Sequence, residues 1–241
     1  MYSASSPATM EEHRDHNTLG GLRRLLAPGP DFCLIDHDHP QREPLQDFIR
    51  QQFHHHHGAR ITTFHPLLLT LSCLGNYRAA LGIRCAAADH LFLEHYLDDT
   101  ADSVLSSALK GHPVARNQIV EIGNLVSTLN GATQLLFLVL VAMLHRAGYP
   151  WVMFTATPQV QRSIARLGFA VTPLCRADPE RVPGGAKQWG RYYDNAPEVI
   201  AGDIRASMAI CDRSRLMRAA LQFYDIQIDA LALQFTKAGT R

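Results

Sequence analysis

Residues 116–148, RNQIVEIGNLVSTLNGATQLLFLVLVAMLHRAG, decide the fold of this chain. Residues 119–126 are rich in apolar and β-branched side chains, which favour a strand. Residues 135–144 are apolar without a break, which is typical of a helix inside a core. A turn containing Gly131 separates the two segments. The stretch therefore predicts a buried strand, a short turn and a long apolar helix.

Glu121 stands in the middle of the predicted strand. Burying a carboxylate costs free energy unless the group is paired, so a glutamate at this position indicates an ion pair or a functional role. Gly123, two residues later, weakens a strand and commonly marks a bulge or a point where a ligand approaches the backbone. Two interpretations stay open at this stage. Glu121 is either a functional acid beside a bulge or a glutamate near the strand end that pairs with an arginine.

The segments before this stretch predict a strand, a helix and a hairpin. Residues 31–36 form a short strand-like run, and residues 41–53 carry apolar side chains three and four positions apart, as in an amphipathic helix. Gly58 is placed to end that helix. Residues 66–73 and 78–87 are two apolar runs joined by a turn-rich connection, which indicates antiparallel strands.

The segments after it predict a second strand and helix pair. Residues 151–155 favour a strand, Pro158 opens a helix that ends at Gly168, and residues 169–174 form the last strand that we expect. Beyond residue 204 the pattern is helical to about residue 236. A mixed sheet follows, because a hairpin is antiparallel while a strand, helix, strand unit forms a right-handed parallel crossover.

Three segments follow a less regular pattern. Residues 91–97 are ambiguous in their secondary structure, and residues 101–109 favour a helix that Gly111 and Pro113 end. Residues 176–197 are polar and contain proline and glycine. A loop of that length predicts either a functional lid or a segment packed on the domain.

The composition excludes several classes of function. Lysine and arginine number 23 against 22 acidic residues, so no net field attracts nucleic acid or an acidic membrane. The five cysteines form no CxxC pair, which suits a reducing compartment. Residues 1–30 lack the apolar core of a signal peptide, and the longest apolar run is far shorter than the roughly 20 residues of a membrane-spanning helix. We expect a cytoplasmic protein without stable membrane insertion; its oligomeric state stays open.

Four consecutive histidines, His54 to His57, form the most conspicuous local signal. Consecutive residues of a helix point about 100° apart, so four in a row cannot converge on one metal ion. The interpretations are a helix C-terminus, where imidazolium favours the dipole, or a catalytic or substrate-contacting role of His57 or His56. We expect no metal site.

Glu94 and His95 look like half of a metalloprotease helix, but the second histidine that such a site requires is missing. Glu94 is expected either to pair with Arg84 near the functional site or to cap buried polar groups. The two interpretations have equal support.

The order of elements over about residues 31–175 resembles the Gcn5-related N-acetyltransferase fold. In that superfamily the fourth strand carries a catalytic carboxylate and a bulge, and the next turn and helix N-terminus bind the pyrophosphate of coenzyme A. The resemblance implies that Glu121 is a general base and that a backbone N–H near Gly123 or Asn124 donates to the oxyanion. It also implies that the cofactor is bound by four residues: Ser127, Asn130, Gly131 and Ala132.

The run Gly82-Ile83-Arg84-Cys85 is similar to a pattern of the acyl-homoserine lactone synthases, a branch of the same fold that takes acyl groups from acyl carrier protein. Asn124 replaces an arginine of that branch. Several further motifs together resemble the thermostable hemolysin family over about residues 50–203: HHHGAR (55–60), LFLEHYL (91–97), residues 119–127, FTAT (154–157) and WGRYY (189–193). That family is named after a haemolytic phenotype.

These resemblances imply an α/β (α+β) fold with a mixed, mainly antiparallel central sheet flanked by helices. The expected parts are a flexible N-terminal segment (1–30), an acyltransferase-like domain (31–203) and a helical C-terminal extension (204–241). A short helix is expected near residues 22–26.

The expected reaction moves an acyl group from a thioester of coenzyme A or acyl carrier protein to a small-molecule amine, without a metal. The expected catalytic residues are Glu121, His57 and Asn124, and the expected substrate-binding residues are Arg84, Glu94, Gly123, Thr155, Trp189 and Tyr193. Thr155 and Thr157 have a second interpretation, which is capping of the following helix. The alternative functions are a membrane-active cytolysin and a non-catalytic module that binds acyl thioesters.

Overall fold

The computed structural model describes residues 29–183 and 186–239. Its central sheet has seven strands among these residues, in the order β1-β2-β3-β4-β5-β7-β6. The strands are β1 (Asp31–Ile35), β2 (Leu67–Cys73), β3 (Asn76–Cys85), β4 (Ile119–Ser127), β5 (Trp151–Ala156), β6 (Val171–Arg176) and β7 (Glu198–Asp203). β4 and β5 are parallel, and the other neighbouring pairs are antiparallel. The predicted mixed, mainly antiparallel sheet is confirmed.

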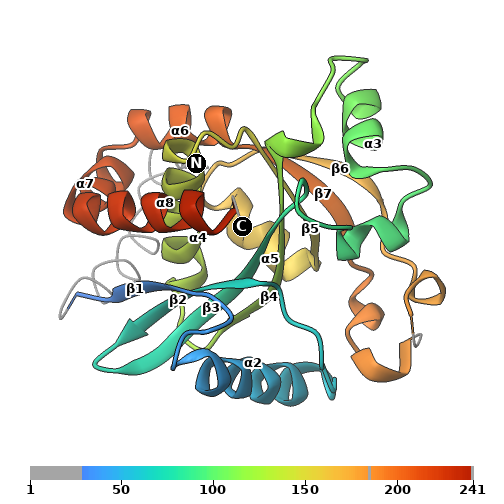
Figure 1. The fold of residues 1–241 in the computed structure, drawn as a ribbon, viewed down its shortest axis with the longest axis horizontal. Coiled ribbons are helices and arrows are strands. Elements are labelled where there is room, and N and C mark those ends of the chain that lie inside the picture. Colours follow the sequence, from blue (N-terminus) through green and yellow to red (C-terminus); the bar gives the residue numbers. More distant parts are fainter. Residues whose placement is uncertain (1–28, 184–185, 240–241) are drawn as a thin grey trace, which may run out of the picture.

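The α-helices of the described residues flank both faces of the sheet (Figure 1). They are α2 (Arg42–His57), α3 (Ala101–Ala108), α4 (Ala132–Arg146), α5 (Pro158–Ala165), α6 (Ile204–Arg213), α7 (Arg215–Phe223) and α8 (Asp225–Gly239). Short 3₁₀ turns fill the longer connections: η1 (Phe92–Tyr96), η2 (Arg116–Gln118), η3 (Pro179–Arg181), η4 (Ala186–Trp189) and η5 (Tyr193–Asn195). The predicted helix near residues 22–26 lies outside the described residues.

α4 is buried between the sheet and the C-terminal helices. Its residues from Leu135 to Leu144 all have less than a tenth of their surface exposed. One side packs on the sheet, while α6, α7 and α8 contact α4 from other sides (Figure 1). Tyr224 and Phe235 of the C-terminal region belong to the same core. This enclosure explains why the helix is apolar all round. The boundary near residue 203 stays a prediction.

α2 and η1 pack on the opposite face of the sheet. Leu45, Ile49 and Phe53 of α2 form a core with Leu68 and Ala80. A third core joins η1 and α3 to the other end of the sheet. The sheet face between these two packed regions is the part that carries the candidate site.

β7 contradicts the prediction that residues 169–174 form the last strand. It lies between β5 and β6 and is antiparallel to both. Its six residues, EVIAGD, follow Pro197 and are bounded by charged residues. Because such a short segment has little pattern of its own, its place depends on pairing with residues far away in the chain. The predicted hairpin and the predicted helices after residue 204 are confirmed.

β4 contains a bulge next to Gly123. Gly82 pairs with Gly123 and Ala80 pairs with Val126, so β4 has one residue more than β3 in this interval. The extra residue reverses the alternation of side chains. Ile122 belongs to the core around α4, whereas Val126 belongs to the core around α2.

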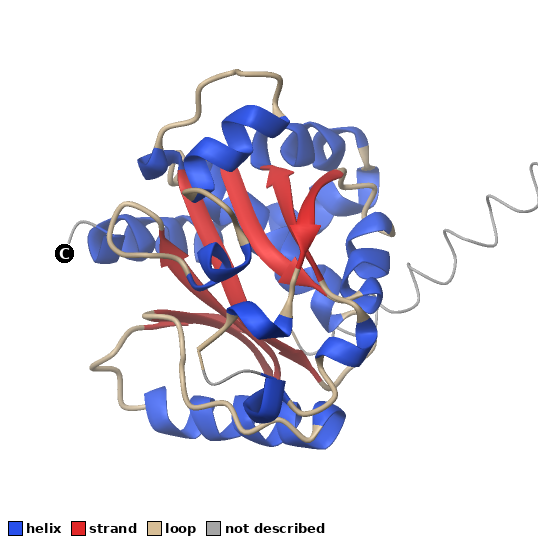
Figure 2. Cartoon of the chain, turned by 90° about the vertical axis from the view of Figure 1, so that its right-hand side faces the viewer, coloured by secondary structure: helices blue, strands red, loops and turns tan. Residues whose placement is uncertain are grey.

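β4 and β5 separate immediately before this bulge. Their last paired residues are Ile122 and Phe154, and β5 continues by pairing only with β7. Figure 2 shows that the strands form two groups at an angle to each other, with short helical turns in front of them. The bulge therefore lies where the sheet opens into a wedge.

None of the helices in the described ranges combines the length and the apolar character that a membrane span requires.

Candidate active site

Glu121 is buried on the sheet face opposite α4, with 2% of its surface exposed. The backbone N–H of Phe92 donates to Oε2 at 3.0 Å, and the N–H of Leu93 donates to Oε1 at 2.7 Å. These groups belong to the start of η1, where the first N–H groups of a helical turn have no partner within the turn. The irregular segment 91–97 therefore folds as a cradle for the carboxylate.

His65 is the second ionisable side chain of the site, and its role was not predicted from the sequence. It stands two residues before β2 and is 7% exposed. Its Nε2 lies 3.3 Å from Oε2 of Glu121, and its Nδ1 lies 3.1 Å from Oδ1 of Asn124. The only sequence signal is a His-Pro pair before an apolar run, which does not identify a partner 59 residues away.

Asn124 holds His65 through its backbone as well. The N–H of His65 donates to Oδ1 of Asn124 at 3.0 Å, and Nδ2 of Asn124 donates to the carbonyl of Thr63 at 3.2 Å. Asn124 has φ of +50°, a conformation that asparagine tolerates better than most residues. The bulge thus turns the amide toward the loop before β2.

Gly82 and Gly123 form the floor under the His65 ring. A Cβ at Gly82 would lie 2.7 Å from Cβ of His65, and a Cβ at Gly123 would lie 2.4 Å from its Cε1. Both distances are below any real contact, so the ring fits only above two cross-strand glycines. Of the two expectations at Gly123, the bulge is confirmed, and the group that lies against this glycine is the side chain of His65.

Glu94 is locked in place by Arg116. The Arg116 guanidinium donates to both carboxylate oxygens, and the N–H groups of Leu91 and Ala101 donate to them at 2.8 Å each. Burial raises the pKa of the Glu94 carboxyl, but these hydrogen bonds outweigh burial and lower the pKa to about 2. The capping interpretation is confirmed.

The predicted pairing of Glu94 with Arg84 is wrong. Arg84 donates to the carbonyl of His90 at 2.8 Å and lies 3.8 Å from Asp89. Arg84 is nevertheless the cross-strand neighbour of Glu121, so both side chains leave the sheet on the same face.

The WGRYY segment packs on the end of α2 and on η1. The Trp189 ring lies 5.6 Å from that of Phe92, and the hydroxyls of Tyr193 and Tyr96 are 2.7 Å apart. The N–H of Arg191 donates to the carbonyl of His57 at 2.8 Å. Of the two interpretations of residues 176–197, the packed segment is therefore the one observed.

The four histidines occupy the last turn of α2, which ends at Gly58 with φ of +67°. The helix C-terminus that we expected there is confirmed. His57 packs against Tyr192, with ring centroids 5.3 Å apart. Burial lowers the pKa of His57, and His56 and Arg191 lower it further. Within the described residues His57 has no recorded contact with Glu121, so its catalytic role stays a prediction.

The predicted cofactor-binding residues lie at the start of α4. Gly131 is the N-cap residue, with φ of +85°, and Ala132 is the first helical residue. Ser127 ends β4, and Asn130 is exposed in the connecting turn.

The two threonines differ from the capping interpretation. Thr155 lies within β5, beyond the point where β4 separates, and shares the sheet face of Glu121. Thr157 is the N-cap residue of α5, but its side chain makes no capping hydrogen bond. Capping by these side chains is therefore wrong.

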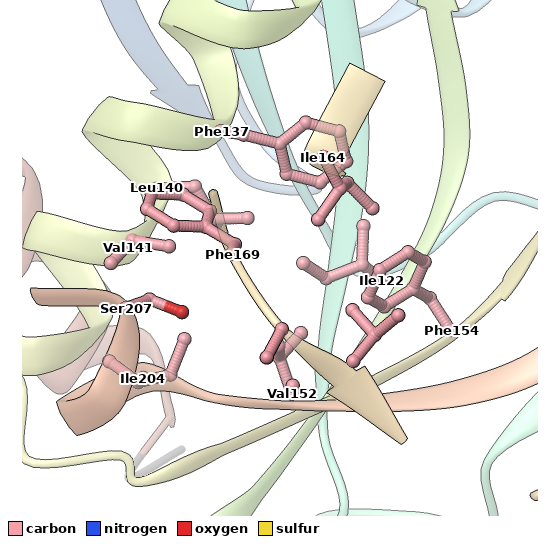
Figure 3. A pocket seen from close by; sticks show the side chains of 13 residues that line it. Ile122, Phe137, Leu140, Val141, Val152, Phe154, Ile164, Phe169, Ile204 and Ser207 are labelled. Atoms are coloured by element: carbon pink, nitrogen blue, oxygen red, sulfur yellow. The ribbon is translucent and has the colours of Figure 1, made fainter. Parts of the chain in front are cut away.

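An apolar cavity of about 30 Å³ lies on the other face of the wedge (Figure 3). Ile122 and Phe154, the last paired residues of β4 and β5, line it together with Phe137 of α4 and Ile164 of α5. Ser207 of α6 contributes a hydroxyl. The carboxylate and the cavity are thus on opposite faces of the sheet at the point where it opens.

The model of the family described as thermostable hemolysin matches residues 35–208. The chain belongs to the thermostable hemolysin family. The match covers strands β2 to β7 and both buried carboxylates, Glu94 and Glu121, so the resemblance to this family is confirmed. No curated protein matches this chain by sequence.

Several solved structures share the fold of this chain at low sequence identity. A coenzyme A-dependent acyl-homoserine lactone synthase, BjaI, with SAM and isopentyl-CoA, has a TM-score of 0.52 and 13% identity over 77% of this chain and 89% of its own. FeeM, an N-acyl amino acid synthase from uncultured soil microbes, has a TM-score of 0.51 and 15% identity over 78% and 98%. TofI, in a ternary complex with an inhibitor and MTA, has a TM-score of 0.53 and 10% identity over 78% and 99%. The expected acetyltransferase-like fold is confirmed.

Proposed function

We propose that this protein is an N-acyltransferase that moves an acyl group from a thioester to an amine. The observation that carries the proposal is the buried Glu121 carboxylate beside the β4 bulge, at the point where β4 and β5 separate. Two of the similar structures, BjaI and FeeM, are named as synthases of acylated amino compounds, and BjaI was solved with isopentyl-CoA. The resemblance in fold supports the same class of reaction here.

The bulge is the proposed place for the thioester carbonyl. Asn124 and Leu125 have no partner on β3 or β5 in the register of the sheet. Backbone N–H groups that the sheet leaves unpaired can donate to a developing oxyanion, which is an effective way to stabilise acyl transfer. Glu121, two residues before the bulge, is proposed to take part in the proton transfer.

The apolar cavity is the proposed place for the acyl chain. In the structure its volume is about 30 Å³, room for roughly two water-sized groups. A longer chain must displace side chains such as Ile164 and Phe137. We therefore propose that these residues set the accepted chain length.

The turn before α4 is the proposed site of the thioester carrier. The exposed turn through Asn130 and Gly131 leads into the first N–H groups of α4, which suit a phosphate of coenzyme A or of the acyl carrier protein prosthetic group. Both carriers present the same phosphate chemistry, so the structure leaves both in the proposal.

The amine is proposed to approach on the face of Glu121. Arg84 and Thr155 lie on that face, and Trp189 and Tyr193 border it through their contacts with η1. Glu94 is proposed to act indirectly, by holding the start of η1, because Arg116 and two N–H groups already occupy its oxygens.

A mass-spectrometric screen tests the proposal. Purified protein is incubated with acyl-CoA and acyl carrier protein thioesters of different lengths and with a set of amines, and products are sought as acylated amines. We expect at least one pair to turn over with wild-type protein. Loss of thioester without an acylated amine, or binding without turnover, would instead favour hydrolysis or a non-catalytic module.

The cavity can be tested with the same assay. We expect Ile164→Ala to shift the preferred acyl chain toward longer substrates, because about one to three methylene groups of space are gained. The measurement is kcat/KM against chain length. An unchanged length profile would place the chain elsewhere.

Membrane lysis is a second candidate, which the family description and exposed apolar side chains of the C-terminal helices favour. Phe223, Ile226 and Leu233 of the C-terminal helices are 62%, 86% and 59% exposed. Leakage of dye from lipid vesicles by the protein alone, without any thioester, would support direct lysis. Leakage only after acyl transfer would identify the acylated product as the lytic agent.

A further inference from the structure

The hydrogen-bond partners of Asn124 define which nitrogen of His65 carries a proton. Nδ2 of Asn124 donates to the carbonyl of Thr63, so Oδ1 is the atom that faces His65. Oδ1 can only accept, and it already accepts the backbone N–H of His65. Since Nδ1 of His65 lies 3.1 Å from this oxygen, Nδ1 must be the protonated nitrogen.

Nε2 of His65 is then the nitrogen with a free lone pair in the neutral ring. It is buried and has no hydrogen-bond partner of suitable geometry among the described residues, although Oε2 of Glu121 lies 3.3 Å away. The carboxylate accepts N–H groups from Phe92 and Leu93, which suits its ionised form. With the ring neutral and the carboxylate ionised, two acceptors face each other, and the pair can take up one proton.

We infer that His65 and Glu121 form one proton-accepting pair, in which Nε2 of His65 takes the proton of the amine and Oε2 of Glu121 stabilises the resulting imidazolium. This inference rests on the proposed acyl transfer and assigns its base. Nε2 lies over the bulge: a Cβ at Gly123 would be 3.0 Å from it. The proton acceptor and the proposed carbonyl site are therefore neighbours.

Neighbouring residues hold His65 at its backbone N–H, its carbonyl, Nδ1 and one face of the ring. Nη2 of Arg42 donates to the carbonyl of His65 at 2.6 Å, Asn124 binds its N–H and Nδ1, and Gly82 and Gly123 lie beneath the ring. A residue fixed in this way holds Nε2 in one direction, beside Oε2 of Glu121. This arrangement is typical of a general base oriented by a third group.

The charged and titratable groups that face the pair come from three elements. Arg84 of β3 shares the face of Glu121, Tyr96 of η1 interacts electrostatically with Glu121, and Arg42 of α2 reaches His65 through its carbonyl. These groups favour or oppose the added proton together, so pH profiles report the pair as a unit.

The proposed step balances as follows. The amine nitrogen attacks the thioester carbonyl, a C–N bond forms, and the amine proton moves to Nε2 of His65. The C–S bond then breaks, the electron pair leaves on sulfur, and Nε2 returns the proton to the thiolate. The products are the acylated amine and the free thiol, and His65 ends neutral with its proton on Nδ1.

The first test reads the proton position directly by long-range ¹H–¹⁵N NMR of the His65 ring in the wild-type protein. We expect the neutral ring to carry its proton on Nδ1, and the Asn124→Ala variant to lose this preference. A neutral wild-type ring with its proton on Nε2 would overturn the inference, because no acceptor would then face Glu121. This readout does not depend on any enzymatic activity.

The second test uses kinetics. His65→Asn retains an amide that can donate to Oδ1 of Asn124 but has no counterpart of Nε2, and we expect kcat to fall by about 10² to 10⁴. His145→Asn, at an exposed position at the far end of α4, is the matched control and should keep its kcat. A His65→Asn protein with wild-type thermal unfolding and a kcat within a few-fold of wild type would overturn the inference.

The double variant His65→Asn/Glu121→Gln separates a pair from two independent residues. We expect it to be no more than a few-fold slower than the slower single variant, because groups that act as a unit lose their contribution once. Losses that multiply would contradict the pair. If wild-type protein transfers no acyl group at all, the proposed function fails, while the NMR experiment still decides where the proton lies.

Discussion

Glu94 and Glu121 are two buried carboxylates held by one short segment, and they differ in their partners. Both accept backbone N–H groups from residues 91–93. Arg116 donates to both oxygens of Glu94, and Nδ1 of the exposed His90 lies 3.5 Å from Oε2, whereas the ion-pair partner of Glu121 within the described residues is His65. An arginine keeps its charge at every accessible pH, while a histidine gains and loses a proton near neutrality. The Glu94–Arg116 pair is therefore suited to stabilising the fold, and the Glu121–His65 pair is suited to transferring a proton.

The largest expected effect comes from exchanging each carboxylate for its amide. Glu121→Gln should lower kcat by about 10³, equivalent to roughly 4 kcal/mol in the activation barrier, and should lower the free energy of unfolding by only about 1 kcal/mol, because one of the N–H groups of Phe92 and Leu93 loses its acceptor. Glu94→Gln should do the reverse and lower the free energy of unfolding by about 2 to 3 kcal/mol, because Arg116 loses its charged partner. Urea unfolding and steady-state kinetics of both variants measure the contrast. If both variants were stably folded and lost the same activity, the proposed difference between Glu121 and Glu94 would be wrong.

The stabilisation by the Glu94–Arg116 pair should be lost in a defined range of acid pH. The pKa of Glu94 is lowered from 4.5 to about 2 in the folded protein, so its stabilisation is complete above pH 4.5 and is lost as pH falls toward 2. The loss should reach up to about 3 kcal/mol at the acid end.

Urea unfolding of wild-type and Glu94→Gln protein between pH 7 and pH 3 measures this loss. The difference in stability between the two proteins should shrink as pH falls. A constant difference would mean that the charge of Glu94 contributes little.

A methyl group under the His65 ring should affect the Glu121–His65 pair more than the Glu94–Arg116 pair. Gly123→Ala places a Cβ 2.4 Å from Cε1 of His65, so the ring must move. We expect a stability loss of about 1 to 3 kcal/mol from overpacking and a larger relative loss of kcat than of binding. Gly75→Ala, at a turn position with φ of +74° and no atoms near the added group, controls for backbone strain alone.

The smallest expected effect comes from the contact of Tyr193 with η1, the segment that binds both carboxylates. Tyr193→Phe removes the hydroxyl that contacts Tyr96 at 2.7 Å, at the end of η1. We expect about 1 kcal/mol of lost stability and a change of no more than a few-fold in kcat. Thermal unfolding and kinetics of the variant test this. A loss as large as that of Glu121→Gln would make Tyr193 part of the chemistry.

The local patterns of the sequence predict most of the fold. The strand, turn and apolar helix around Glu121, the hairpin and α2 depend on periodicities within one segment, and all are present. β7 was not predicted, because six residues after Pro197 carry too little pattern to show that they pair with β5 and β6.

The site was harder to predict than the fold, because its contacts join distant segments. Glu121 and Gly123 attract attention through their residue types in a strand. His65 does not, since its partner Asn124 is 59 residues away. Arg84 and Arg116 were equally available to Glu94 from the sequence, and only the path of η1 decides between them.

Gly190 links two motifs that are 130 residues apart in the chain. A Cβ at this position would lie 2.1 Å from the carbonyl oxygen of His57, and φ is +54°. The turn of the WGRYY segment can therefore approach the last turn of α2 only while this residue is glycine. In evolutionary terms, we expect HHHGAR and WGRYY to be inherited as one unit: relatives with a larger residue at position 190 should also have a different end of α2.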